Sequence, residues 1–305
     1  MTAETPVRVA IVIVNWNRAH DTARCLRSLE SSRFSGWSAI VVDNGSTDGS
    51  AQFLRERFPT VELVGNERNL GFAGGTNVGI ERALAQAVPY ILLLNNDAEL
   101  LPDTLSVLLE AADARPRAGI VSPLILYGDG RRIWFAGAYR RRFPPGFSWP
   151  GYGSTRFPCL VPRRIDYATG CAMLLRREML QEIGLLDGAY FMYWEDMDLC
   201  ERARRAGWEI WLIPKAVVRH HVSSTLGEWS AEKWYHLARH IPTFYLRYYR
   251  WPRPAMLAYA GWVTVRELLR GNRRCIAPLW RGFRDGWRKE VRARARTNGD
   301  GNRTG

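Results

Sequence analysis

Short apolar runs alternate with polar loops along the first third of the chain, and this alternation predicts the fold. Four runs are dominated by aliphatic residues with little polar alternation, which is typical of strands buried on both faces of a parallel sheet. They lie at residues 9–14, 39–42, 61–64 and 91–94. Each is followed by a polar loop and a helical pattern, such as the helix expected over residues 76–87. The sequence therefore predicts a doubly wound, mainly parallel α/β sheet.

Polar side chains stand where the predicted strands end. Asn15, Asp43 and Asp97 each follow an apolar run directly or within three residues. In open α/β sheets, ligands bind just outside the carboxyl ends of the strands, so these residues are candidates for a small-molecule site. The competing interpretation is that the carboxylates cap turns or helices. The glycine loops match neither GxGxxG after the first strand nor GxxxxGK[ST], which argues against a simple dinucleotide domain or a P-loop.

Charge changes the picture only at the carboxyl-terminal end. Residues 231–305 carry 17 basic and 5 acidic side chains, out of 43 and 30 in the whole chain, so they hold nearly all of the net charge of +13. Arginine, tryptophan and tyrosine mix in this segment, which suits helices that lie in a membrane interface. Single-stranded nucleic acid, or packing on the rest of the chain or on a second subunit, are the alternatives. The five cysteines contain no CxxC pair, which favours reduced thiols and gives no zinc signature.

Six segments form an ordered set in the first 225 residues. They read IVNWN at 13–17, VDNGSTDG at 42–49, NLGFAGGTNVG at 69–79, LNND at 94–97, ATGCAML at 168–174 and WEDMDLC at 194–200. In content and order this set resembles the family-2 glycosyltransferases of the GT-A fold, particularly bacterial rhamnosyltransferase-like members. The resemblance implies a GT-A catalytic domain at 1–225, with a nucleotide-sugar half at about 1–120 and an acceptor half at about 121–225. A helical extension at 226–295 and a disordered tail at 296–305 would follow.

The resemblance also implies a donor site for a dTDP- or UDP-linked sugar. Asp43 would accept a hydrogen bond from the ring N–H of thymine or uracil, whereas cytosine presents an acceptor there and would be repelled. The implied donor-binding set comprises Asn15, Asn17, Asp43, Asn69, Gly75, Asn77, Asn95 and Asn96.

A divalent cation, Mg²⁺ or Mn²⁺, is implied between the donor phosphates. By resemblance Asp97 would bind it, helped by His220 or, with a poorer match, His221. Asn95 stands where the family's DxD motif has its first carboxylate, so less negative charge faces the metal. A structural role is the alternative for an isolated histidine.

The pair Glu195 and Asp196 supplies the implied catalytic carboxylates. By resemblance Asp196 removes the acceptor proton as the hydroxyl attacks, which inverts the anomeric carbon, and its neighbour Glu195 would help to raise its pKa. Helix capping is the alternative role. The implied acceptor-binding residues are Trp194, Tyr193, Gly170 and Asp198. The segment 127–158, rich in glycine, proline, aromatics and arginine, is expected to be an irregular acceptor-side loop.

The sequence-based hypothesis is an inverting glycosyltransferase that moves a sugar, rhamnose from dTDP-rhamnose being one candidate, to a cell-surface glycan or lipid-linked acceptor. It would act in the cytoplasm as a peripheral protein of the inner membrane face, because no signal peptide and no apolar run long enough to span a bilayer is found. A homo-oligomer is left open, and nucleic acid is not expected as a partner. A nucleotidyltransferase, or a basic membrane- or nucleic-acid-binding protein with a decayed nucleotide-sugar site, are the competing functions.

Overall fold

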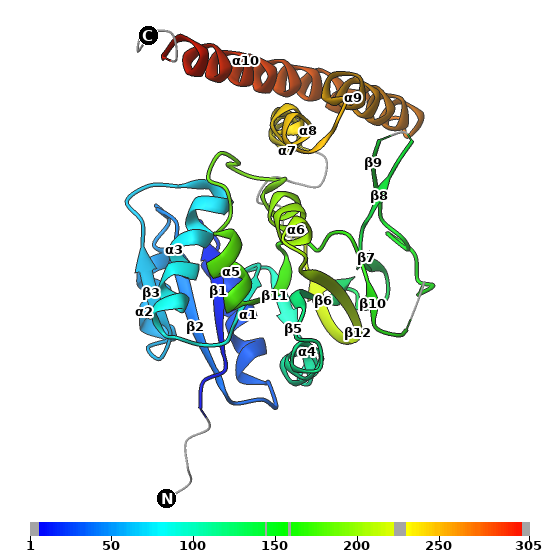
Figure 1. Cartoon of the computed structure of the whole chain (residues 1–305). Helices are drawn as coiled ribbons and strands as arrows, with labels where there is room; N and C mark the ends of the chain where they lie inside the picture. Colours follow the sequence, from blue (N-terminus) through cyan, green and yellow to red (C-terminus); the bar gives the residue numbers. More distant parts are fainter. Residues whose placement is uncertain (1–5, 144, 158–159, 223–229, 301–305) are drawn as a thin grey trace, which may run out of the picture. The chain divides into compact units, whose positions relative to one another are not determined.

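The computed structural model divides the chain into two compact units, whose elements are labelled in Figure 1. The residues that it describes are 6–143, 145–157, 160–222 and 230–300, with side chains up to 292. The first unit comprises Met1–Tyr139, Ser148–Phe191 and Glu195–Ser223. The second comprises Arg140–Phe147, Met192–Trp194 and Ser224–Gly305.

The first unit is built on a ten-stranded mixed sheet with the order β10-β12-β6-β11-β4-β1-β2-β3, in which β5 also pairs with β12 and β7 with β6. The strands are β1 (Val9–Asn15), β2 (Trp37–Asp43), β3 (Glu62–Gly65), β4 (Tyr90–Leu94), β5 (Ala98–Leu100), β6 (Ala118–Tyr127), β7 (Ile133–Phe135), β10 (Arg163–Arg164), β11 (Ala172–Arg176) and β12 (Glu209–His220). β4, β1, β2 and β3 run parallel, as do β6 and β12, whereas β11 is antiparallel to both of its neighbours. The predicted α/β fold is confirmed.

Helices of the first unit pack on this sheet. They are α1 (Ala19–Glu30), α2 (Ser50–Arg57), α3 (Gly71–Ala85), α4 (Thr104–Asp113), α5 (Arg177–Ile183) and α6 (Glu195–Arg205). The helix expected from residue 76 begins earlier, at Gly71, because the glycines belong to the helix and let it approach the sheet. A Cβ on Gly79 would lie 2.3 Å from Val12 Cγ1 of β1.

Five helical segments make up most of the second unit. They are α7 (Ala231–Arg239), α8 (Ile241–Tyr248), α9 (Pro252–Leu269), the 3₁₀ turn η1 (Arg273–Cys275) and α10 (Ile276–Asp300). α10 lies against α7 so closely that a Cβ on Gly286 would fall 1.9 Å from Arg239 O. The helix continues to Asp300, into the segment expected to be a disordered tail, and residues 301–305 lie outside the described part of the chain.

The segment 127–158 contains regular structure. β7 extends the main sheet, and a hairpin of β8 (Tyr139–Arg141) and β9 (Gly146–Ser148) follows it. The prediction of an irregular loop is therefore wrong for these residues. Strands of three residues give too short an apolar pattern to be identified from sequence.

Candidate active site

The ends of β1 and β2 hold a buried carboxylate. Asn15 and Asp43 are paired across the two parallel strands, and the Asn15 amide donates to Asp43 Oδ1 over 2.8 Å. Asn15 Oδ1 accepts from the Thr22 hydroxyl at 2.7 Å, and the Asn15 side chain is 0% exposed. Asn15 therefore orients Asp43 from behind and has no exposed surface for a nucleoside base.

Asp43 is fixed on its other side as well. The backbone N–H of Ser46 donates to Asp43 Oδ2 over 3.1 Å, and Ser46 Oγ accepts from the backbone N–H of Asn17. Asn17 adopts the left-handed conformation with φ 53°, and its Oδ1 accepts from the N–H of Thr47. These contacts hold the Asp43 carboxylate in one orientation with 4% of the residue exposed, so it can meet a ligand only at its edge.

Asn44 organises the next loop, a role that the sequence analysis missed. Its amide donates to Asn69 Oδ1 and to Gly71 O, both at 3.0 Å. Its Oδ1 accepts from the Asn66 amide at 3.0 Å and from the Leu70 N–H at 3.1 Å. Asn69 is thereby held within the loop, where it also accepts from the Gly71 N–H. The available sequence signal was the position of Asn44 directly after a strand-end carboxylate.

Two residues of the implied donor set instead join elements of the fold. Gly75 admits the neighbouring side chain of Asn44, since a Cβ there would lie 2.9 Å from its amide nitrogen. The Asn77 amide donates to Leu186 O at 2.7 Å, and the Leu186 N–H donates back to Asn77 Oδ1 at 3.1 Å. Asn77 therefore ties α3 to the loop between α5 and α6.

Asp97 and His220 meet where β4 passes into β5. β5 pairs antiparallel with β12, which sets His220 opposite Ala98, and His220 Nε2 lies 3.0 Å from Asp97 Oδ1. Asp97 is 8% and His220 is 5% exposed. His220 Nδ1 has no hydrogen-bond partner among the described residues, and the Trp134 and His220 rings meet in a T-shaped contact with 4.3 Å between their centres.

This pair fits part of a divalent cation site. Two adjacent ligands of an octahedral ion at about 2.1 Å lie about 3 Å apart, close to the separation of Asp97 Oδ1 and His220 Nε2. Among the described residues, no group of three or more His, Cys, Asp and Glu side chains is arranged to hold a metal ion. Further ligands would therefore have to come from water and substrate.

The two asparagines before Asp97 lie differently. The Asn96 amide donates to Thr22 Oγ1 at 3.1 Å, which joins it to the hydroxyl that also supports Asn15. Asn95 is held through its backbone, whose N–H donates to Cys171 O at 2.8 Å, and its side chain is half-buried. The Asn95 amide is thus the less constrained of the two.

Asp196 lies at the start of α6 with both carboxylate oxygens oriented. Gly170 N–H donates to its Oδ2 at 3.1 Å and Met197 N–H to its Oδ1 at 2.8 Å. Burial raises the pKa of Asp196 despite these hydrogen bonds, which lower it. Burial also raises the pKa of the Cys171 thiol, and the charges of Asp97 and Asp196 raise it further. Cys171 precedes the first residue of β11, its carbonyl accepts from Asn95 N–H, and the N–H of the preceding Gly170 donates to Asp196.

Glu195 is the more deeply buried member of the pair. It is 5% exposed, and its Oε2 has no hydrogen-bond partner among the described residues. Burial, followed by the charge of Asp196, raises the pKa of Glu195 well above its usual value. Burial disfavours the charged form of a carboxyl, the more so when one of its oxygens has no hydrogen-bond partner.

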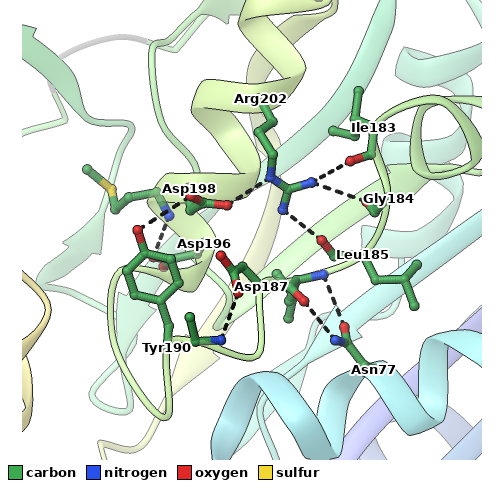
Figure 2. Close-up of polar contacts among 12 residues, drawn as sticks. Asn77, Ile183, Gly184, Leu185, Asp187, Tyr190, Asp196, Asp198 and Arg202 are labelled. Carbon is green, nitrogen blue, oxygen red and sulfur yellow. Dashed lines mark hydrogen bonds and ion pairs between the residues drawn. The ribbon is translucent and has the colours of Figure 1, made fainter. Parts of the chain in front are cut away.

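Asp198 belongs to a network of polar contacts that joins α6 to the loop between α5 and α6 (Figure 2). It is 0% exposed, its Oδ2 accepts from Arg202 Nε at 2.8 Å and its Oδ1 from the Tyr190 hydroxyl at 3.4 Å. The same guanidinium donates to Ile183 O and Leu185 O, each at 2.7 Å. Asp198 is therefore inaccessible to an acceptor, and the sequence-based role assigned to it does not fit its burial.

The loop held by Arg202 also closes on the glycine-rich start of α3. The Phe72 N–H donates to Phe191 O at 2.7 Å. Gly71, with φ 77°, has no space for a side chain, because a Cβ would lie 2.3 Å from the same Phe191 oxygen. This contact joins the donor-side loop to the segment that leads into Asp196.

Tyr193 and Trp194 belong to the second unit, where both have positive φ angles of 67° and 78°. Trp194 is 6% exposed, its indole N–H donates to Leu237 O at 2.8 Å, and its ring lies 5.0 Å from that of Phe244. The Trp194 ring is therefore part of an aromatic core and not an open wall for a sugar. An aromatic run has the same sequence pattern in both situations.

None of the described helices combines the length and the apolarity that crossing a bilayer requires.

Comparison with known proteins identifies the relatives of this chain. The family profile described as "Glycosyl transferase family 2" matches residues 10–184. An N-acetylglucosaminyl-diphospho-decaprenol L-rhamnosyltransferase of Mycobacterium tuberculosis is 32% identical over 298 residues, which cover 87% of this chain and 95% of that protein. The low-salt glycan biosynthesis hexosyltransferase Agl10 of Haloferax volcanii is 28% identical over 204 residues, which cover 65% of this chain and 62% of the relative.

Solved structures give the same fold. The mannosyltransferase PcManGT of Pyrobaculum calidifontis, in complex with GDP-Man and Mn²⁺, has a TM-score of 0.58 at 18% identity and covers 92% of this chain and 74% of its own. GalNAc-T7 with UDP, GalNAc and Mn²⁺ has a TM-score of 0.61 at 16% identity, and the match covers 78% of this chain and 48% of GalNAc-T7. These likenesses confirm the predicted GT-A fold.

Proposed function

Because this chain belongs to glycosyl transferase family 2, we propose that it transfers a sugar from a nucleotide-diphosphate donor to a lipid-linked glycan, with inversion at the anomeric carbon. The observation that carries the proposal is the carboxylate of Asp196, which the N–H groups of Gly170 and Met197 orient. Gly170 is followed by Cys171, whose carbonyl accepts from the N–H of Asn95 in the segment that carries Asp97.

Asp196 acts as the general base. Its carboxylate accepts the proton of the acceptor hydroxyl while the hydroxyl oxygen bonds to the anomeric carbon and the bond from that carbon to the diphosphate breaks. The raised pKa makes it a stronger proton acceptor than an exposed aspartate. Burial likewise raises the pKa of the neighbouring Glu195 well above its usual value, so the pair is desolvated as a unit.

Asp43 selects the nucleoside. The Asp43 carboxylate is fixed by Asn15 and Ser46. At the exposed edge of this carboxylate it accepts a hydrogen bond from the ring N–H of a thymine or uracil base. Asn44 and Asn69 hold the adjoining loop against the nucleoside. Of the implied donor set, Asn15, Gly75 and Asn77 serve by positioning, and Asn17, Asn95 and Asn96 remain candidates for direct contact.

Asp97 and His220 would hold a divalent cation, whose charge would offset that of the departing diphosphate. Their 3.0 Å separation and the donor types support this assignment.

The donor sugar and the acceptor are proposed from the mycobacterial relative. As its name states, that relative transfers L-rhamnose to N-acetylglucosaminyl-diphospho-decaprenol. We therefore propose rhamnose in its dTDP-linked form as the sugar and a diphosphate-linked polyprenyl glycan at the cytoplasmic membrane face as the acceptor.

A transfer assay tests this proposal. The purified chain, Mn²⁺ and a synthetic N-acetylglucosaminyl-diphosphoprenol are incubated in turn with dTDP-rhamnose, UDP-N-acetylglucosamine, UDP-glucose and GDP-mannose, and products are detected by mass spectrometry. We expect the addition of one deoxyhexose with dTDP-rhamnose. Transfer from GDP-mannose alone would contradict the nucleoside assignment, and no transfer from any donor would contradict the acceptor class.

A further inference from the structure

Arg141 in the second unit is a cation whose buried nitrogens meet no hydrogen-bond acceptor in the described part of the chain. Its guanidinium carbon lies 4.4 Å from the centre of the Trp262 ring. Its Nε and Nη2 are buried, and neither has a partner among the described residues. Stacking on tryptophan offsets only part of the cost of burying a cation. Unpaired buried polar groups in native proteins often mark the place of an ion or a ligand.

A second arginine lies over the same ring, and a third shares its carboxylate partner. Arg266 lies over Trp262, with 4.8 Å between its guanidinium carbon and the ring centre. Arg266 and Arg270 share the buried carboxylate of Glu267, at 2.7 and 3.3 Å. Among Arg141, Arg266, Arg270 and Glu267 the positive charge exceeds the negative by two, and two of these arginines lie over Trp262. Arginine binds phosphate oxygens through parallel N–H groups, so this charge suits a diphosphate.

The outward face of α9 continues from Trp262 without any charged residue. Its members are Pro254, Leu257, Ala258, Gly261, Val265, Leu268 and Leu269. At 3.6 residues per turn they fall within about one third of the helix circumference. Leu257, Val265, Leu268 and Leu269 are 51%, 56%, 46% and 85% exposed. Val265 and Leu269 follow Trp262 by three and seven residues, so the apolar face adjoins the arginine cluster.

We propose that the second unit binds a prenyl diphosphate, with Arg141 and Arg266 on the diphosphate and the apolar face of α9 along the prenyl chain. An apolar face alone would suit a bilayer or a second subunit equally. The adjoining positive surplus and the unpaired guanidinium nitrogens favour an amphiphile whose charge is concentrated at one end. The inference rests on the proposed function, since it assigns the site for the lipid portion of the acceptor.

Calorimetric titration of the full chain with geranylgeranyl diphosphate, in the absence of any sugar donor, tests the site. Arg141→Gln should weaken binding by about tenfold or more, because a charged hydrogen bond contributes about 1.5–3 kcal/mol. Arg142→Gln is the matched control, since the adjacent Arg142 is exposed, and should bind as the wild type does. Leu269→Glu should weaken the binding of geranylgeranyl diphosphate and leave the affinity for inorganic diphosphate unchanged.

The site would be overturned if the wild type did not bind geranylgeranyl diphosphate, or if Arg141→Gln and Arg142→Gln weakened that binding equally. It would also be overturned if phosphatidylglycerol vesicles bound as tightly as geranylgeranyl diphosphate and lost the same affinity in Arg141→Gln. A change of oligomeric mass in Leu269→Glu by light scattering would assign the face to a subunit interface instead. Because the titration omits the sugar donor, failed sugar transfer with intact geranylgeranyl diphosphate binding would refute the proposed function and not the site.

Discussion

Replacing Arg202 by methionine should destabilise the first unit more than any exposed arginine substitution on α6. Asp198 is 1% exposed in its side chain and Arg202 is 24% exposed, so the substitution leaves a buried carboxylate without its cation. It also leaves Ile183 O and Leu185 O without their donor. Breaking one side of a fully buried pair costs about 3–5 kcal/mol, and the partial exposure of Arg202 reduces this to about 3 kcal/mol.

Thermal unfolding measures the effect. At about 2–4 °C per kcal/mol for a unit of this size, Tm should fall by about 6–12 °C. Arg205→Met is the matched control on the same helix, because Arg205 is 54% exposed and lies 3.3 Å from Glu201. We expect that control to lower the stability by less than about 1 kcal/mol. Equal Tm values for the two variants would refute the supporting role of Arg202.

Three further predictions address the loop, the metal and pH. Gly71→Ala should lower the free energy of unfolding in urea by more than about 2 kcal/mol, because its Cβ would clash with Phe191 O. The control Gly49→Ala, at φ 85° with no neighbour within 4 Å, should lower it by about 1 kcal/mol. Equal losses would contradict the close approach of Gly71 to Phe191. His220→Ala should weaken Mn²⁺ binding by about tenfold or more in calorimetry with nucleoside diphosphate present, and unchanged affinity would remove this ligand from the site. The folded chain holds the proton of Glu195 more tightly than the unfolded chain does, so the free energy of unfolding should fall as pH rises above about 4.3 towards the raised pKa. Glu195→Gln should make the free energy of unfolding in urea depend less on pH. The same pH dependence in the wild type and the variant would contradict the burial argument.

The sequence predicted the parallel part of the sheet because each apolar run there is followed by a polar loop and a helical pattern, which connect parallel strands. It did not predict that β11 is inserted antiparallel between β4 and β6. An apolar run such as Ala172–Arg176 carries no information on its direction, which is set by the chain that precedes it and by the strands that it joins.

The sequence indicated the places of the carboxylates in the candidate site better than it indicated the contacts of the asparagine amides. Asp43, Asp97 and Asp196 lie at strand and helix ends, as their positions in the sequence indicated. An asparagine can turn its amide to a ligand or to a neighbouring loop, and Asn15 and Asn77 do the latter. That choice depends on tertiary neighbours, which local sequence does not reveal.

The central claim is that Asp196 is the base for sugar transfer, and Asp196→Asn tests it most directly. The substitution keeps the size of the side chain and removes its capacity to take up a proton. It also replaces one of the two oxygens that accept from Gly170 and Met197 by an NH2 donor. We predict that calorimetry will find the affinity for dTDP-rhamnose within about twofold of the wild type, while single-turnover transfer falls by about a hundredfold or more. Transfer at a rate near that of the wild type would contradict the account.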